Sequence, residues 1–350
     1  MNTVVPWSDD AYHAARPKIG IDPKEVLKID ERVGLHPSMK RLKARYDAGE
    51  VAIVQGVGYP RPNRSHFRSM AIWHSADPEE GAPKTGWLGR VADRLDASGG
   101  DPSVALSLSN PMPFALQRGS GTVMAFESEE GFALLPDKRF AQGKAAQVEE
   151  FRRLCAEGGG GERSYADRVR RTASAGVASA DRLVECLHSG KASATYPRGA
   201  GGRLAQVARL IDGGYGARVY YVTAGGWDTH ARQKDAHAGL LGGLSDGVVA
   251  LMEDVERAGR GRDVCVLVFS EFGRRLAENG SLGTDHGTCG PVFVVGGGVK
   301  GGVVGGAPDL SKLVDGDPVA TVDFRAVYRG VVEGWLGVSG VVEGGGEALA

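Results

Sequence analysis

The chain has 350 residues, of which 42% are hydrophobic and 24% charged, and its 54 glycines are scattered rather than periodic. This length and composition predict a globular protein with a sizeable core and exclude a collagen-like repeat. The formal net charge of -1 gives no electrostatic reason to expect nucleic acid or an anionic membrane as a partner.

Signals for crosslinking and membrane insertion are missing from the sequence. The four cysteines form neither a CxxC pair nor a metal-finger spacing, so a disulfide framework is not implied. No apolar run is long enough to span a bilayer, and the first ten residues lack the basic and apolar regions of a signal peptide. As written, the chain is expected to be a cytoplasmic protein without a membrane span.

Four short apolar runs, each ended by glycine, predict buried strands. In chain order they are Glu50–Gly58, Ala217–Gly226, Asp263–Gly273 and Pro291–Gly298. Between the second and third runs, apolar residues recur at three- and four-residue steps from Leu241 to Val255, which predicts a helix packed on a sheet. The alternation of strand and helix favours a parallel sheet covered on both faces.

The remaining segments are predicted as covering or inserted structure. A second helical stripe runs from Phe324 to Leu336 near the C-terminus. The glycine-rich segment 156–163 is typical of a loop, and an Ala/Arg-rich helical stretch follows at 164–188. We interpret about 93–201 as an insertion or cap within a single domain that covers 1–350.

The chemistry-bearing residues follow the predicted strands. In an open parallel sheet, ligands bind beyond the carboxyl ends of the strands, where the loops converge. The loops after the first three strands and before the fourth contain acids, histidines, serines and an arginine: Ser65, His66, Asp228, His230, Gln233, Ser270, Glu271, Arg274, Asp285 and His286. The last two reach the same edge only if their loop folds back.

Carboxylates and imidazoles that converge on one edge are suited to a divalent cation of the zinc, manganese or iron type. Each residue also has a structural interpretation. Asp228 is a candidate N-cap of the following helix, Asp285 a turn residue, and Glu271 a partner of Arg274 or Arg275. His286 has the fewest structural explanations, because it lies between two glycine-bounded turns.

Ser65 has two interpretations. The segment after the first strand is typical of a loop that enters a helix, so Ser65 is a candidate N-cap. It is equally a candidate nucleophile, because a serine beside a metal ion can lose its hydroxyl proton through coordination. GxSxG is absent from the sequence, which disfavours the serine-hydrolase elbow.

These motifs together resemble the bacterial domain-of-unknown-function family 1501, which is similar to sulfatases and alkaline phosphatases. The resemblance rests on segments that span nearly the whole chain: NTVVPWSDDAYHAARP, SHFRSMAIWHSA, GWLGR, GGWDTHARQ, SEFGRR, GTDHGTCGPVFVVGGGVKGG and DFRAVYRGVVEGWLG. It implies an α/β fold with a doubly wound, mostly parallel sheet of alkaline-phosphatase/sulfatase type and an inserted helical or cap region.

The resemblance also implies a site. Ser65 matches the nucleophile, while Arg64 and Arg274 are the candidates to neutralise the oxygens of the ester. The implied metal ligands are Asp228, His230, Glu271 and His286, and Phe272 stands where relatives carry a metal-binding histidine. Asp285 is a further candidate ligand on the residue pattern alone. The expected cofactor is a divalent ion, zinc, manganese, calcium or iron.

The beginning of the sequence departs from the family pattern. Relatives usually start with an apolar strand and a Gly-Gly-x-Asp-Gly segment, often after a twin-arginine export signal, whereas this sequence begins at MNTVVP. We expect a truncated start, with an open slot in the sheet beside Val51–Gln55 or Val264–Phe269. An upstream signal would make the protein exported or periplasmic.

The leading functional hypothesis is a metal-dependent hydrolase of phosphate or sulfate esters, on a small molecule or a polymer, that attacks with Ser65. The alternative is a catalytically degenerate family member that acts as a binding or scaffold protein. Metal content and metal-dependent thermal stability distinguish the two hypotheses.

Overall fold

The computed structural model describes residues 1–79, 83–96, 100–109, 111–126, 143–156 and 164–347. The chain divides into two compact units, which we describe separately. The first unit comprises Met1–Gly81, Ser193–Ala205 and Ala224–Ala350, and the second comprises Ala82–Ala192 and Gln206–Thr223.

The first unit is built on a mixed sheet with the strand order β10-β4-β9-β8. All eight residues of β4 (Val51–Gly58) are buried, as its apolar run predicts. The strands β10 (Gly302–Val304) and β13 (Val322–Asp323) both pair with β4 in parallel, at successive positions along it. On its other side lies β9 (Gly290–Val295), which continues the sheet to β8 (Val266–Val268).

The strand β9 runs antiparallel to both β4 and β8. Parallel neighbours need a long crossover, usually a helix, whereas the segment between β8 and β9 contains neither helix nor strand. Pairing on both sides of β4 means that the predicted slot beside Val51–Gln55 is filled. Along β8, the pairing found in the described part of the chain is with β9 alone.

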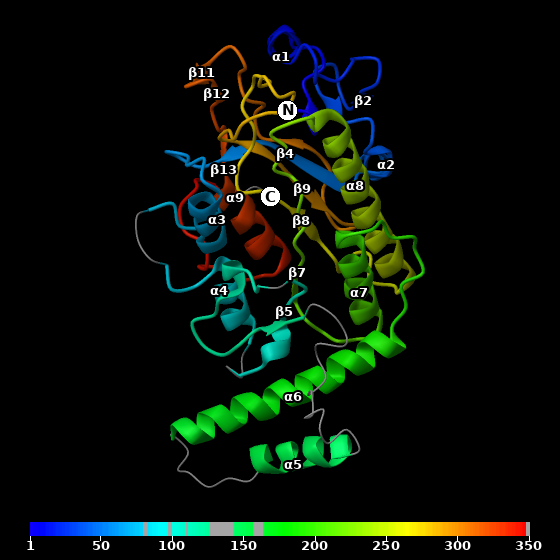
Figure 1. The fold of residues 1–350 in the computed structure, drawn as a ribbon, viewed down its shortest axis with the longest axis vertical. Coiled ribbons are helices and arrows are strands. Elements are labelled where there is room, and N and C mark those ends of the chain that lie inside the picture. Colours follow the sequence, from blue (N-terminus) through cyan, green and yellow to red (C-terminus); the bar gives the residue numbers. More distant parts are fainter. Residues whose placement is uncertain (80–82, 97–99, 110, 127–142, 157–163, 348–350) are drawn as a thin grey trace. The chain divides into compact units, whose positions relative to one another are not determined.

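Helices cover both faces of this sheet (Figure 1). On one side α2 (Lys40–Asp47) packs against α8 (Gln233–Arg257), and the buried Ser245 hydroxyl of α8 accepts a hydrogen bond from an α2 backbone amide. On the other side lie α3 (His66–Ser75) and α9 (Phe324–Arg329), the latter continued by a π-helical turn, η5 (Gly330–Trp335). Trp73 of α3 stacks on Phe324 with ring centroids 4.6 Å apart, which joins the two helices.

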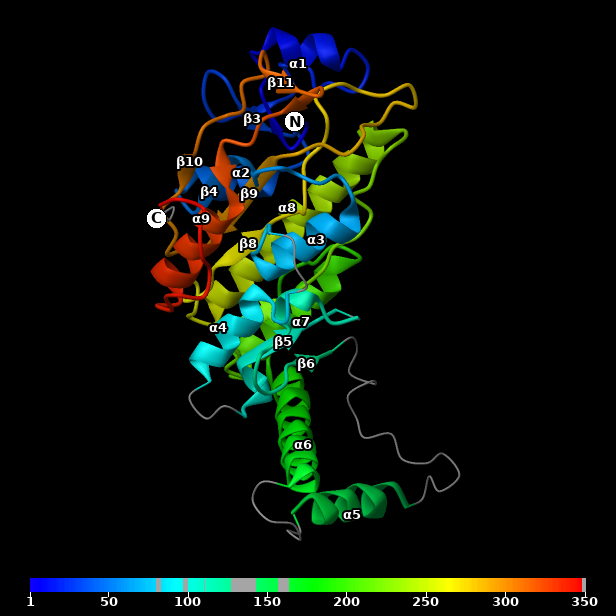
Figure 2. The same ribbon diagram turned by 90° about the vertical axis from the view of Figure 1, so that its left-hand side faces the viewer.

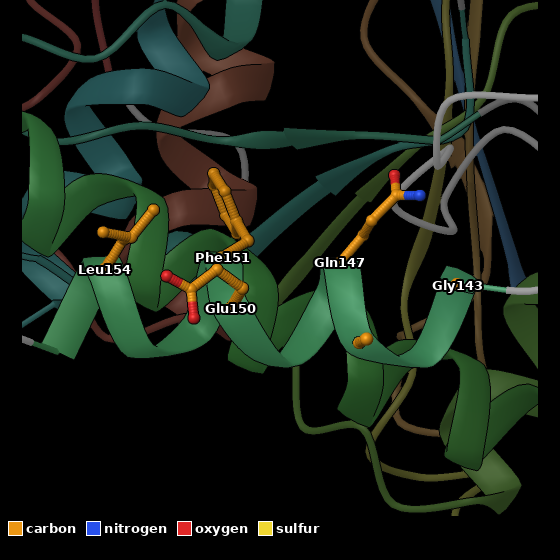
Figure 3. Close-up of a pocket in the computed structure, with 6 residues that line it drawn as sticks. Gly143, Gln147, Glu150, Phe151 and Leu154 are labelled. Atoms are coloured by element: carbon orange, nitrogen blue, oxygen red, sulfur yellow. The ribbon is translucent and has the colours of Figure 1, made fainter. Parts of the chain in front are cut away.

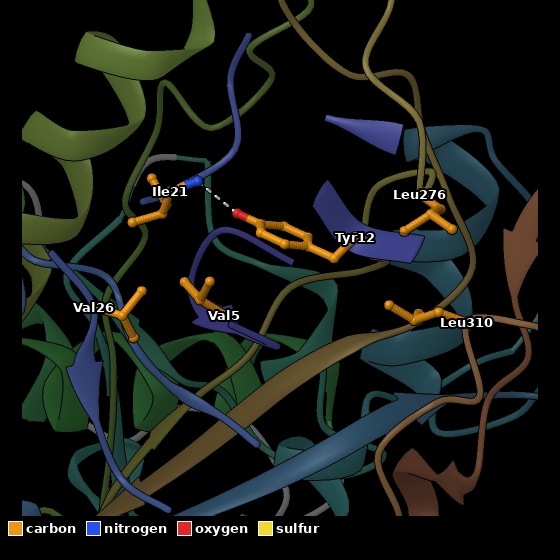
Figure 4. Packing of buried hydrophobic residues seen from close by; sticks show 6 residues of the cluster. All are labelled: Val5, Tyr12, Ile21, Val26, Leu276 and Leu310. Atoms are coloured by element: carbon orange, nitrogen blue, oxygen red, sulfur yellow. Dashed lines mark hydrogen bonds between the residues drawn. The ribbon is translucent and has the colours of Figure 1, made fainter. Parts of the chain in front are cut away.

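The N-terminal residues form a small layer of their own in the first unit. It contains a three-stranded antiparallel sheet and one short helix: β1 (Val4–Val5), α1 (Asp10–Ala15), β2 (Leu27–Lys28) and β3 (Gly34–Leu35). Tyr12 of α1 is fully buried in an apolar cluster that also holds Leu276 and Leu310, and its hydroxyl accepts a hydrogen bond from the Ile21 amide (Figure 4). The segment that follows β8 is thereby packed under the N-terminal layer. A separate hairpin pairs β11 (Leu313–Val314) with β12 (Asp317–Pro318).

The second unit contains a parallel sheet of three short strands with the order β6-β5-β7. Its strands and helical segments are β5 (Ala105–Ser107), β6 (Met124–Ala125), β7 (Val219–Tyr221), α4 (Trp87–Leu95), η1 (Pro102–Val104), η2 (Phe114–Leu116), α5 (Lys144–Ala156) and α6 (Tyr165–Ser189). Here α5 and α6 pack against each other (Figure 2). The helix α7 (Ala200–Asp212) precedes β7.

The α/β class and the presence of parallel strands are confirmed, in a molecule with several sheets. Every strand and helix predicted above has a counterpart, but β7 and β8 lie in different sheets although α8 connects them. Most of the predicted loop 156–163 lies outside the described residues. No helix of the described segments is long and apolar enough to cross a bilayer.

Candidate metal centre

Three loops of the first unit carry the candidate residues. The loop after β4 turns into α3 at Ser65, whose amide donates to the Asn63 side chain at 2.8 Å. The second loop, after β7, brings Asp228 and His230. Its backbone is held by Asn279, whose side-chain amide donates to the carbonyl of His230 at 3.0 Å.

The third loop, between β8 and β9, folds back on itself. Arg274 and His286 form an isolated antiparallel bridge, and the amide of Gly287 donates to the carbonyl of Gly273 at 2.9 Å. This close pairing returns His286 to the end of β8 at which Glu271 lies. The reversal that the sequence analysis required for Asp285 and His286 is therefore present.

Three histidines surround Asp228. The Nε2 atoms of His230 and His286 lie 2.8 and 2.9 Å from Asp228 Oδ1, and His66 Nε2 lies 3.4 Å from Oδ2. The two nitrogens of His230 and His286 are themselves only 2.9 Å apart. Both nitrogens face the same carboxylate oxygen, and either one would have to be unprotonated to bind a metal ion.

Each of the three imidazoles has an oxygen at its other nitrogen. His66 Nδ1 lies 2.6 Å from Glu271 Oε1, His230 Nδ1 lies 3.3 Å from Asp285 Oδ1, and His286 Nδ1 lies 2.8 Å from the carbonyl of Arg64. An oxygen at Nδ1 can accept a hydrogen bond from that nitrogen, an arrangement that leaves Nε2 for a metal ion when Nε2 does not itself donate to Asp228. The three Nε2 atoms all face the same carboxylate.

His66, Asp228 and His286 form a group that could hold a metal ion, because one ligand atom from each lies within 4.8 Å of the others. Zinc bonds of about 2.0 to 2.2 Å place ligands of one tetrahedral ion roughly 3 to 3.5 Å apart. The contacts of Asp228 with His286 at 2.9 Å and with His66 at 3.4 Å are close to this range. Two imidazoles and one carboxylate suit zinc, manganese or iron better than calcium, which prefers six to eight oxygens.

The charge of Asp228 is stabilised by its neighbours. Partial burial favours the neutral acid, but hydrogen bonds from His286 and Arg274 and the charge of Arg274 outweigh it, so the pKa of Asp228 is well below its ordinary value. Arg274 Nη2 lies 2.6 Å from Asp228 Oδ1. Hydrogen bonds from Asn279 and His230 also lower the pKa of Asp285. Both carboxylates are therefore ionised at neutral pH.

Phe272 forms an apolar wall beside the group. Its ring centroid lies 4.8 Å from that of His66 and 4.5 Å from that of His286. Phe272 thus packs against two of the candidate ligands, and it restricts the orientations of both rings.

Comparison with known families identifies one matching family. The sequence profile described as "Protein of unknown function (DUF1501)" matches residues 3–328, which include every residue of the cluster. The chain belongs to the DUF1501 family. Searches among curated proteins and among solved structures find no match.

The structure of this DUF1501 protein places the predicted site residues in two shells. Asp228, His230 and His286 converge directly, whereas Glu271 and Asp285 lie behind His66 and His230 as partners of Nδ1. The structural interpretations do not hold for two of these residues. Glu271 contacts His66, and α8 begins after Arg232, four residues beyond Asp228.

Ser65 lies at the N-cap position of α3, but its side chain makes no capping hydrogen bond. It is exposed, and in sequence it lies between Arg64 and His66. His66 belongs to the cluster, and the carbonyl of Arg64 lies beside Nδ1 of His286. Arg64 donates to the buried Asp317 through Nε and Nη2, so Nη1 is the guanidinium nitrogen that this contact does not use. Arg274 donates to the carbonyls of Trp227 and Thr284 as well as to Asp228.

Sequence reasoning misses two functional candidates of this DUF1501 chain, Asn279 and Asp317, and leaves a third without a role. His66 is among the residues expected at this edge but receives no role, although a histidine after a buried strand is the signal that identifies the other ligands. Asn279 and Asp317 are hydrogen-bonded to residues of the loops that carry the cluster. The hydrogen bonds of Asn279 to His230 and Asp285, and of Asp317 to Arg64, follow no local sequence pattern.

A hollow of about 590 Å³ lies in the second unit, along α5 (Figure 3). Its lining is mostly apolar, with Phe151 and Leu154 among its residues, and Glu150 is the ionisable group. Arg153 pairs with Glu150 at 2.6 Å. The lining offers no group of ligand-binding or catalytic residues comparable to the histidine cluster.

Proposed function

We propose that this DUF1501 protein is a metal-dependent hydrolase of phosphate or sulfate esters that uses Ser65 as its nucleophile. The observation that carries the proposal is the convergence of His66, Asp228 and His286 on one potential ion position, directly beside Ser65 in the chain. These three residues alone would leave a fourth tetrahedral position open, which is typical of catalytic rather than structural zinc sites. His230, whose Nε2 lies 2.8 Å from Asp228 Oδ1, is the remaining candidate ligand.

A divalent ion bound there would lower the pKa of a coordinated hydroxyl and withdraw charge from the ester oxygens. The Ser65 oxygen would lose its proton to solvent and bond to phosphorus or sulfur as the bond to the alcohol oxygen of the ester breaks, and the alcohol would leave after taking up a proton. Water would then attack the Ser65 ester, releasing phosphate or sulfate and restoring the hydroxyl. The side chain of Ser65 makes no capping hydrogen bond that would compete with this role. Arg64 has Nη1 remaining to contact an oxygen of the ester. Arg274 donates a hydrogen bond to Asp228 and stabilises its ionised form. We also propose that Arg274 contacts an oxygen of the ester.

The finer description of the fold also belongs to this proposal. A helix-covered sheet with candidate ligands in the loops beyond β4 and β8 is compatible with the alkaline-phosphatase and sulfatase type. Fold does not determine chemistry, so the proposal rests on the residues of the site. The substrate class is an ester on a small molecule or a polymer.

The decisive experiment measures metal binding and ester hydrolysis separately. We expect zinc or manganese at 100-fold its dissociation constant to stabilise the protein by about 3 kcal/mol. Asp228→Asn should remove most of this effect, whereas Asp309→Asn, which changes an exposed carboxylate of a turn, should not. Hydrolysis of aryl phosphate, phosphodiester and aryl sulfate is then compared with each metal.

Ser65→Ala separates the nucleophile from the metal site. It should abolish turnover and leave metal affinity nearly unchanged. A wild-type rate in Ser65→Ala would exclude Ser65 as nucleophile, and a protein that neither binds nor is stabilised by any of these metals would favour the binding or scaffold alternative.

A further inference from the structure

Asp317 is a buried carboxylate that the proposed chemistry does not use. It begins β12, its side chain is 1% exposed, and Oδ2 accepts from Nε and Nη2 of Arg64. Its other oxygen lies 3.5 Å from Nε of Arg275 and has no hydrogen-bond partner. A buried carboxylate is costly unless it is paired, so the contact with Arg64 is strongly favoured.

Arg64 belongs to a loop that needs external anchors. Residues 60–65 are all exposed, and Arg61 has a left-handed backbone with φ of 54°. The amide of Asn63 donates to the Tyr59 hydroxyl at 2.9 Å, a contact only four residues apart in sequence. The next residue makes the distant attachment, from the Arg64 side chain to Asp317 in a hairpin more than 250 residues away in sequence.

The backbone of Arg64 connects this anchor to the cluster. Its carbonyl accepts the hydrogen bond from His286 Nδ1 at 2.8 Å, and its carbonyl carbon is bonded to the nitrogen of Ser65. The position of this one peptide therefore sets both the acceptor that fixes the His286 tautomer and the place of the Ser65 hydroxyl.

We propose that Asp317 is a positioning residue that acts through Arg64 to hold Ser65 and His286 in place. The expected effect on turnover through Ser65 rests on the proposed function. The expected effect on His286 does not depend on that function. Without the carboxylate, the Arg64 side chain has no buried partner, and the exposed loop gains conformational freedom. The carbonyl then no longer holds Nδ1–H, so Nε2 is no longer kept for an ion.

The test compares Asp317→Asn, Arg64→Gln and the double variant. In ¹⁵N-labelled protein without metal, the His286 Nδ1–H proton should give a slowly exchanging NMR signal that is weakened or lost in all three variants. Zinc affinity by calorimetry should fall roughly 10- to 100-fold, the range for loss of an outer partner of a metal-binding histidine. A lower kcat with an aryl ester should accompany it.

The double variant should be no worse than either single variant, because Asp317 acts through Arg64. It also leaves neither member of the Arg64–Asp317 pair as an unpaired charge, and so remains informative if a single variant fails to fold. Asp96→Asn is the matched control. It removes another buried carboxylate paired with an arginine, Arg118, and should lower stability without changing the His286 signal or zinc affinity.

The outcomes separate the two hypotheses. An unchanged His286 signal and zinc affinity in Asp317→Asn would overturn the positioning role, whatever the activity. A weakened His286 signal in a protein that neither binds zinc nor hydrolyses esters would uphold the positioning role and refute the proposed function. Loss of thermal stability alone, equal to that of Asp96→Asn, would make Asp317 a structural residue.

Discussion

The three histidines of the cluster differ in the oxygen that each presents to Nδ1. His66 has a carboxylate at 2.6 Å, His286 a backbone carbonyl at 2.8 Å and His230 a carboxylate at the longer distance of 3.3 Å. A carboxylate partner makes the imidazole more basic and a better ligand than a carbonyl does. His66 is therefore the most strongly supported ligand, and the side chain that supports it is Glu271.

Glu271→Gln tests whether this residue orients a ligand or is one. We expect metal affinity to fall roughly 10- to 100-fold, because the amide still accepts a hydrogen bond from His66 but has no charge. His66→Ala should reduce affinity further. Both affinities can be measured by calorimetry with zinc in the intact protein.

Glu79→Gln is the control, since Glu79 is an exposed glutamate whose partner is the exposed Arg61. If Glu271→Gln removes metal binding as completely as His66→Ala does, Glu271 is itself a ligand, as the sequence alone indicated. A change no larger than that of Glu79→Gln would remove Glu271 from the centre altogether.

At the scale of elements, glycines explain how acids and a histidine fit between two apolar strands. A Cβ atom on Gly273 would overlap the carbonyl of Cys289, and one on Gly287 would overlap the backbone of Arg274. The two arms of the loop between β8 and β9 can pack backbone to backbone only because these side chains are missing. This packing brings Glu271 and His286 to the same cluster.

Gly273→Ala should therefore damage both stability and the metal centre. Relief of the overlap requires the arms to separate, and overpacking of this kind costs about 1 to 3 kcal/mol. We expect a lower free energy of unfolding in urea and weaker zinc binding in the folded protein.

Gly239→Ala is the opposite control within the same unit. Gly239 lies in α8, and a Cβ atom added to it would have no neighbour within 4 Å, so alanine should stabilise the helix by roughly 0.5 to 1 kcal/mol. Equal effects of the two substitutions would mean that the contact between the loop arms is not tight.

An element can be predicted from the sequence when its own residues determine it, and cannot when contacts with distant residues do. The strand β4 is predictable because eight consecutive residues are buried, and α8 because its apolar stripe has a helical period. The antiparallel direction of β9 is not predictable from its own residues, because it depends on pairing with strands that are distant in sequence. At the site, residue types identify Asp228 and His286, whereas the roles of Glu271 and Asp317 depend on contacts with residues about 200 and 250 positions away.

At the scale of the whole molecule, acid should destabilise the first unit through histidines buried in the neutral form. Burial lowers the pKa of His74 to about 4 and that of His237 to about 3, where repulsion from nearby cations adds to the effect of burial. Burial also lowers the pKa of His36. These imidazoles accept a proton more readily in the unfolded chain, so folding is favoured above their ordinary pKa.

His74 allows this linkage to be measured. Its ordinary pKa of 6.5 falls to about 4 in the folded protein, so between these values the unfolded state binds more protons. Stability due to neutral His74 is complete above pH 6.5 and decreases as the pH falls towards 4, by up to roughly 3 kcal/mol at about 1.4 kcal/mol per pH unit. His74→Asn, which cannot be protonated, should be less stable at pH 7 but should lose less stability than the wild type between pH 7 and pH 4.5.

Urea denaturation with a chelator present gives the free energy of unfolding at each pH. His188→Asn, a substitution of an exposed histidine, should follow the wild-type curve. Parallel curves for the wild type and His74→Asn would show that His74 does not remain neutral in the folded protein as the pH falls.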